Sequence, residues 1–203
     1  MLKISKVAEP DFLKAYKRKY NPKNWDDYNE DRIKFELKTF IAENEQNIND
    51  VTLCVYCERE IDIANNKGHI EHIKPKEKFP QFFQEYENLS ISCDSHGTCG
   101  HSKQNKYDNR FINPVEDNPK EFLAYDDLTG EIIAKDNSVK DRVDYTVNEV
   151  LKLNEYSLCK ARKTLFIQLG FITKPEELDS IVSYYKSFST LLNYYRTYIF
   201  NHE

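Results

Sequence analysis

The sequence predicts an α+β fold that is mostly helical, with a short β-containing core between two helical regions. Apolar residues recur at helical spacing in the two end regions, as in amphipathic helices that pack on a core. The middle differs: it holds short β-type runs, and eight of the ten Cys and His residues fall between positions 54 and 101. We therefore expect an N-terminal helical segment, a central core and a C-terminal helical region, at residues 1–50, 51–115 and 116–203.

The first 115 residues are expected to form helices followed by short strands. Pro10 suits the first turn of one helix, and an Asn-Pro break at 21–22 separates it from a second helix. The polar run after Cys99 predicts a short helix with a charged face. Three β-type runs predict the strands, at 51–54, 69–73 and 89–92.

The C-terminal region is expected to begin with a small hairpin and end in two helices. Thr129 and Gly130 provide the hairpin turn. Gly170 is expected to terminate the first helix. Pro175 then opens a last helix, whose apolar stripe continues to Ile199. Core packing is the preferred interpretation of the tyrosines on this stripe.

Composition and charge limit the classes of function. No apolar run approaches the length of about 18 residues that a membrane span needs. The N-terminus lacks the apolar core of a signal peptide, so we expect a cytoplasmic protein without membrane association. The formal net charge is -5, whereas proteins that grip nucleic acid over a large surface are usually basic. Any nucleic-acid contact must come from a local patch or from a partner.

The cysteines predict a metal site. Cys159 stands apart among apolar helical positions and is interpreted as a core residue. Thioredoxin-like chemistry is disfavoured because no βαβ pattern surrounds the CxxC pair. Two pairs on separate loops fit a four-thiolate zinc site, with His96 as a competing fourth ligand and isolated packed cysteines as the alternative. The pairs are Cys54 with Cys57 and Cys93 with Cys99.

Polar residues within and just after this cysteine frame predict hydrolytic chemistry. Phosphodiester hydrolysis needs a base for water, a divalent ion for the developing charge and a group that orients the base. Histidine suits the base because its pKa lies near neutral pH. If residues 69–73 form a strand, Glu71 and His72 face opposite sides. The candidate residues occur in the order Glu71, His72, Asn88, His101 and Lys103.

The string CVYC…IEHIKP…ENLSISC…CGHSKQNK resembles the HNH endonuclease motif of the ββα-metal (His-Me finger) fold in its four-cysteine, zinc-containing form. More narrowly, the chain resembles the retron- and Septu-associated HNH endonucleases of bacterial anti-phage defence. The resemblance is strong for 51–115 and weak outside. One departure is that His101 stands two residues after Cys99, where common members place the histidine directly after the cysteine.

The resemblance implies a role for each candidate residue. His72 would be the general base, and Glu71 and His101 would bind the catalytic divalent ion. Asn88 would order the loop and the histidine, or join the metal shell. Lys103 would contact the phosphate or the leaving group. A structural zinc would be held by Cys54, Cys57, Cys93 and Cys99. Mg²⁺ is the expected catalytic ion, with Mn²⁺ or Ni²⁺ as substitutes in vitro.

The resemblance also implies a substrate and a partner. Residues 67–110 carry seven Lys and Arg against six Asp and Glu. This small excess of positive charge is insufficient for tight nucleic-acid binding. We therefore expect an endonuclease acting on DNA, with RNA as a variant, beside an ATPase subunit that contacts the aromatic-rich helices. The rival hypothesis is a catalytically silent zinc module that binds nucleic acid or protein. The two differ at His72, which only a nuclease needs.

Overall fold

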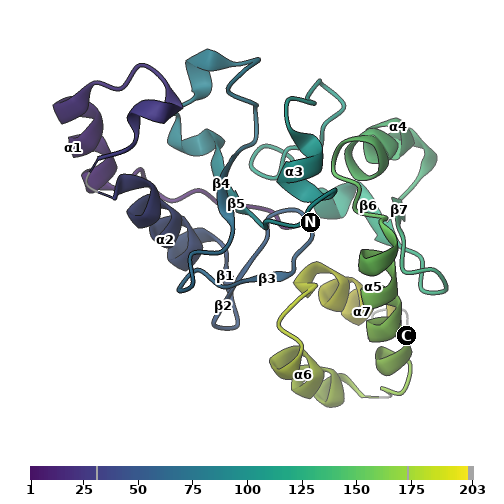
Figure 1. Cartoon of the computed structure of the whole chain (residues 1–203). Coiled ribbons are helices and arrows are strands. Elements are labelled where there is room, and N and C mark those ends of the chain that lie inside the picture. The colour runs from purple at the N-terminus through teal and green to yellow at the C-terminus, as the bar shows by residue number, and fades with distance from the viewer. Residues whose placement is uncertain (31, 173, 201–203) are drawn as a thin grey trace.

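The computed structural model describes residues 1–30, 32–172 and 174–200, so residues 31, 173 and 201–203 of the predicted helical segments lie outside it. The fold is mixed α+β, as predicted, with several helices and small antiparallel sheets (Figure 1). The α-helices are α1 (Asp11–Tyr20), α2 (Ile33–Glu45), α3 (Cys99–Lys103), α4 (Lys140–Val143), α5 (Tyr156–Leu169), α6 (Pro175–Tyr184) and α7 (Ser189–Phe200). The strands are β1 (Asn47–Ile48), β2 (Val51–Leu53), β3 (Glu60–Ile61), β4 (His69–His72), β5 (Leu89–Ser92), β6 (Leu123–Tyr125) and β7 (Ile132–Ala134).

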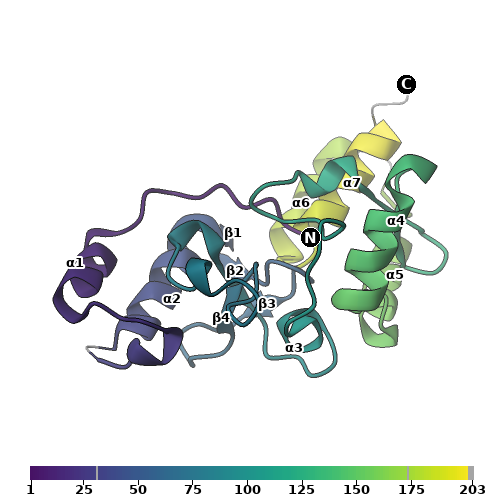
Figure 2. The ribbon, with the colours of Figure 1, turned by 90° about the horizontal axis from the view of Figure 1, so that it is seen from above.

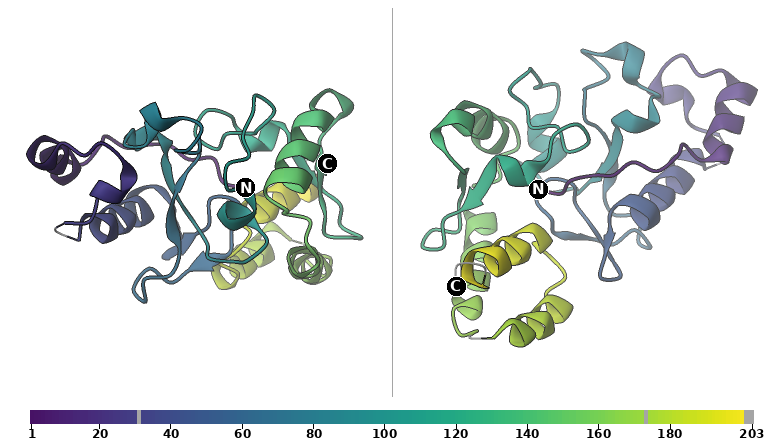
Figure 3. Two further views of the ribbon diagram at one scale, coloured as in Figure 1. Left: turned by 45° about the horizontal axis from the view of Figure 1, so that its top comes forward. Right: turned by 180° about the vertical axis from the view of Figure 1, so that it is seen from behind.

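Helices α1 and α2 lie at the opposite end of the molecule from α5, α6 and α7, with α3 and the β4–β5 pair between them (Figures 1 and 2). The first ten residues run as an extended segment from the middle of the molecule to α1 (Figure 3). The backbone N–H of Leu2 donates to the Val55 carbonyl at 3.0 Å, and that of Ile4 donates to the Pro114 carbonyl at 2.8 Å. The N-terminal segment is thereby fixed against the central core.

The β4–β5 hairpin is the sheet that positions the motif residues. Its strands are antiparallel, and the register pairs His69 with Ser92 and His72 with Leu89. All four residues of β5 are buried, so this strand runs through the core instead of facing solvent on one side. Helix α2 packs on both strands and buries Leu37 and Ile41 completely. The three predicted strand regions are confirmed.

The C-terminal region confirms the hairpin, formed by β6 and β7, and the end of α5 at Gly170. The prediction of one last helix was wrong, because the chain forms α6 and α7 with a break at 185–188. The break is tertiary in origin: the N–H of Phe188, whose φ is 60°, donates to the Glu58 carbonyl. The Glu58 carboxylate accepts from Ser189 and from the backbone N–H of Thr190, at the start of α7. Contacts from a distant segment therefore override the helical periodicity.

Candidate functional site

Four cysteines form a buried cluster, which confirms the predicted grouping. The Sγ atoms of Cys54, Cys57, Cys93 and Cys99 all lie within 4.8 Å of one another. The first two lie on the turn after β2, Cys93 follows β5 directly and Cys99 opens α3. His96 is exposed and lies against the ring of His101 instead, with the ring centroids 5.3 Å apart. The fourth member of the cluster is therefore Cys99.

The cysteine cluster fits a tetrahedral metal ion such as zinc. Zn–S bonds of about 2.3 Å give a tetrahedron with edges of about 3.8 Å, and the Cys57 and Cys93 sulfurs lie 3.7 Å apart. The backbone N–H of Cys93 donates to the Cys54 sulfur at 3.3 Å, which suits a thiolate. Burial lowers the pKa of Arg59, but the nearby sulfurs outweigh this effect and hold its pKa above the ordinary value. Arg59 thus offsets part of the cluster's negative charge.

The two faces of β4 carry different chemistry, as the strand prediction required. His69 and Glu71 point toward α3, where Glu71 Oε1 pairs with Lys103 Nζ at 2.8 Å. Burial would raise the pKa of Glu71, but the Lys103 ammonium and the His69 ring hold it at about 2. Lys103 is 1% exposed and also donates to the His72 carbonyl at 2.8 Å. A phosphate contact by Lys103 would therefore require it to leave these partners.

His72 lies on the opposite face of β4, against the stretch that connects α1 and α2. Its ring meets Trp25 edge to face, with centroids 4.6 Å apart. Its Nε2 lies 2.9 Å from the Phe83 carbonyl oxygen. Because a carbonyl oxygen only accepts, Nε2 carries the hydrogen and Nδ1 is the basic nitrogen. Burial lowers the pKa of His72 to about 4, so the ring is neutral at pH 7.

Asn88 orders the loop between β4 and β5. Its Oδ1 accepts from the Lys74 N–H at 2.7 Å, and its Nδ2 donates to the carbonyls of Lys74 and Phe82. Both ends of the loop are thereby tied to one side chain. Since Phe83 belongs to the same loop, Asn88 also helps to place the carbonyl that orients His72. These contacts match the loop-ordering alternative of the sequence analysis.

A second polar cluster joins β4, β5 and α3. One ligand atom from each of His69, Asp94 and His101 lies within 4.8 Å of the others, and all three residues are at least partly exposed. Asp94 directly follows Cys93, and His101 lies two residues after Cys99, so the same two segments contribute to both clusters. Of these three residues only His101 was predicted. Strand alternation could have found His69, which shares a face with Glu71, whereas no sequence signal singled out Asp94.

Gly100 explains the Cys-Gly-His spacing. A Cβ atom at this position would lie 2.6 Å from His69 Nε2 and 2.7 Å from Glu71 Oε2. Any side chain here would displace the polar residues of β4. The glycine therefore lets the first turn of α3 approach β4 closely enough for Cys99 and His101 to reach their separate clusters.

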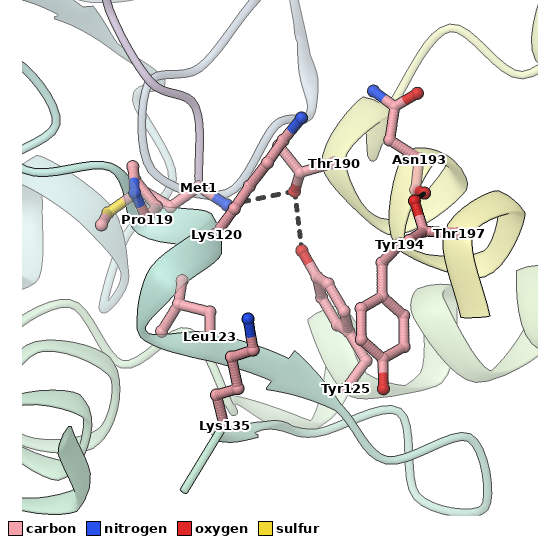
Figure 4. Close-up of a pocket in the computed structure, with 10 residues that line it drawn as sticks. All are labelled: Met1, Pro119, Lys120, Leu123, Tyr125, Lys135, Thr190, Asn193, Tyr194 and Thr197. Atoms are coloured by element: carbon pink, nitrogen blue, oxygen red, sulfur yellow. Dashed lines mark hydrogen bonds between the residues drawn. The ribbon is translucent and has the colours of Figure 1, made fainter. Parts of the chain in front are cut away.

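A cavity of about 300 Å³ lies between the β6–β7 hairpin and α7 (Figure 4). Tyr125 and Leu123 form part of its wall, and the Tyr125 hydroxyl shares a 2.7 Å hydrogen bond with Thr190. The side chains of Lys120 and Lys135 also line it. None of the motif residues lines this cavity, so it is separate from the two clusters.

Comparison with protein-family models finds no match, and comparison with curated proteins finds none either. Over the ranges that the structure describes, no helix combines the length and apolar character that crossing a membrane requires.

Proposed function

We propose that the chain is a metal-dependent HNH endonuclease with a ββα-metal core and a structural zinc at the cysteine cluster. Its substrate is a nucleic-acid phosphodiester, DNA in the leading hypothesis and RNA as a variant. Support comes from the chain order of the elements that bear the motif: β4 carries Glu71 and His72, Asn88 immediately precedes β5, and α3 carries His101. Mg²⁺ or another divalent cation would neutralise charge on the phosphate and the leaving oxygen.

The orientation of His72 carries this proposal. The Phe83 carbonyl fixes the hydrogen on Nε2, which leaves Nδ1 with the lone pair that a general base uses to take a proton from water. Packing of the ring against Trp25 and the loop held by Asn88 restrain the ring. In the proposed mechanism His72 accepts the proton from water. Asn88 positions the His72 ring through the loop that carries Phe83. Lys103 holds the Glu71 carboxylate and the His72 carbonyl in place.

The proposed cellular role is that of an effector in bacterial anti-phage defence, working with an ATPase partner. Exposed aromatic residues on the C-terminal region support a protein partner: Phe171 is 80% exposed and Tyr184 is 79% exposed. Each of these side chains exposes apolar area that a protein partner would cover. Co-purification with the ATPase, and its loss when Phe171 and Tyr184 are changed to Ser, tests this partnership.

The nuclease is tested by plasmid cleavage in Mg²⁺ and in Mn²⁺, with and without the ATPase, using wild type, His72→Ala and the control His96→Ala. His96 is exposed and lies outside the cysteine cluster. We expect His72→Ala to lose cleavage while zinc content stays at the wild-type level, and His96→Ala to retain cleavage. An RNA substrate is included in the same assay.

A catalytically silent zinc module that binds nucleic acid or protein is the second candidate. One observation favours it: Glu71 and Lys103 are buried and paired with each other, so a phosphate contact by Lys103 or ion binding through Glu71 Oε1 would break this pair. Absence of cleavage of DNA and RNA by the wild type, with and without the ATPase, would select this candidate.

A further inference from the structure

We propose that His69, Asp94 and His101 form an open site for a divalent transition-metal ion, and that Glu71 orients His69 instead of binding the ion. The three residues come from β4, from the segment after β5 and from α3, which lie side by side (Figure 1). The inference rests on the proposed function, since it names residues for the divalent ion that the nuclease needs. It differs from the expected pair of Glu71 and His101.

The two ring nitrogens of His69 face different carboxylates. Nδ1 lies 3.1 Å from Asp94 Oδ1, close to the separation of about 3.0 Å between adjacent ligands in an octahedron with bonds of about 2.1 Å. Nε2 lies 3.5 Å from Glu71 Oε2. A metal-binding histidine usually donates its other N–H to a carboxylate, which fixes its tautomer. This geometry assigns Nδ1 to the ion and the Nε2 hydrogen to Glu71.

Glu71 is poorly placed to bind the ion itself. Its Oε1 accepts from the Tyr56 hydroxyl at 3.1 Å and pairs with the buried Lys103. Ligation through Oε1 would draw it away from Lys103 and leave a buried ammonium without its partner, at a high cost in free energy. Oε2 faces His69 Nε2 at 3.5 Å, where it orients that ring. Asp94 has no such conflict: its Oδ2 accepts from the Gly68 N–H at 2.6 Å, which leaves Oδ1 directed at His69.

The site is accessible and its donors select the class of ion. The side chains of His69 and Asp94 are 34% and 48% exposed, and His101 is also exposed, so an ion here could exchange and keep positions for water or phosphate. Two imidazoles and one carboxylate suit Mn²⁺, Co²⁺, Ni²⁺ or Zn²⁺ better than Mg²⁺, which prefers oxygen ligands.

The test is a titration of zinc-loaded protein with Mn²⁺, followed by the electron paramagnetic resonance signal of free Mn²⁺. We expect one exchangeable Mn²⁺ per chain in wild type and in the control His96→Gln. His69→Gln and Asp94→Asn should weaken binding by at least 100-fold, whereas Glu71→Gln should weaken it by about 10- to 100-fold. Absence of an exchangeable ion, or binding lost in Glu71→Gln but retained in His69→Gln and Asp94→Asn, would overturn the proposal.

A second measurement separates this site from the nuclease. Imidazole ¹⁵N resonances are recorded while diamagnetic Cd²⁺ replaces Mn²⁺, and we expect the ion to shift Nδ1 of His69 while Nε2 keeps its hydrogen. Retention of the free-protein Nδ1 shift would contradict the site. Normal ion binding in a chain that cuts no nucleic acid would support the metal site and contradict the proposed nuclease. Failure of the metal-site proposal can therefore be distinguished from failure of the nuclease proposal.

Discussion

The cysteine cluster and the His69–Asp94–His101 cluster are neighbours that differ in burial and in their need for an ion. The cysteines are buried, and four thiolates so close together need a bound cation to compensate most of their charge. The polar cluster is open, and its side chains contact one another and Glu71 without an ion. Removal of an ion should therefore affect folding at the first cluster and only binding at the second. The predictions below test this difference.

The largest effect is expected from Cys54→Ser. Binding of zinc to small cysteine sites contributes about 10–16 kcal/mol, so loss of one ligand should unfold much of the segment 51–115. Zinc content and the thermal melt followed by circular dichroism measure the change. Cys159→Ser, outside the cluster and half-buried, is the control and should retain zinc. An unchanged melting temperature for metal-free wild type would show that the cysteine cluster does not depend on an ion for folding, and would contradict the proposed difference between the clusters.

The next effect is expected from Lys103→Met. The substitution keeps the volume of the side chain but leaves Glu71 charged and buried, which should cost about 3–5 kcal/mol. Adding Glu71→Gln should restore much of the loss, as measured by urea unfolding at pH 7. Lys140→Met is the control: its pair with Asp144 is exposed and should contribute less than about 0.5 kcal/mol. Equal losses of stability in the two lysine variants would show that the Glu71–Lys103 pair does not hold the polar cluster rigidly.

The third effect is a pH dependence of stability that arises from His72, on the other face of β4. Its pKa is lowered to about 4, mainly by burial, with Lys76 and Lys103 lowering it further against the opposing effects of Phe83 and Glu71. The unfolded ring binds a proton below about pH 6.5, so this contribution to stability is complete above that value and falls as pH decreases toward 4. The loss amounts to about 3 kcal/mol.

The measurement is urea unfolding from pH 8 to 4.5 for wild type and His72→Gln. Since His69 has a raised pKa and contributes in the opposite direction, the difference between the two proteins is the relevant quantity. We expect the variant to lose less stability on acidification. Parallel curves would show that His72 is solvated in the folded protein.

The smallest effect is expected from Gly100→Ala. The added Cβ would press on His69 and Glu71, and overpacking of this kind costs about 1–3 kcal/mol. Zinc should stay bound while affinity for Mn²⁺ falls. Gly170→Ala, where a Cβ meets its neighbours at ordinary contact distances of 3.5 Å, should leave both properties unchanged. Loss of zinc from Gly100→Ala would indicate that α3 shifts as a whole.

The elements that follow local rules were predictable from the sequence. The strand runs around His69 and Leu89 became β4 and β5, and period-two alternation correctly placed Glu71 and His72 on opposite faces. The paired cysteines correctly predicted their own cluster because few other arrangements suit four thiols close together. The catalytic roles of His72, Asn88 and His101 remain predictions.

Features that depend on distant contacts were not predictable. The break before α7 arises from Glu58, more than 120 residues earlier, and periodicity carries no trace of it. Asp94 gains its place from the turn that follows β5 and from the Gly68 N–H. The pairing of Lys103 with Glu71 likewise needs the close approach of α3 to β4 at Gly100. In the sequence this approach appears only as the single residue between Cys99 and His101.

The sharing of two short segments by both clusters has a thermodynamic consequence. Cys93 is joined directly to Asp94, and Cys99 is separated from His101 by Gly100 alone, so an ion that orders one ligand set also restricts the backbone of the other. Occupancy of the two sites should then be linked. By reciprocity, the factor by which zinc raises affinity for the exchangeable ion equals the factor by which that ion raises affinity for zinc. The two shared segments would thus make the affinity of each site depend on occupancy of the other.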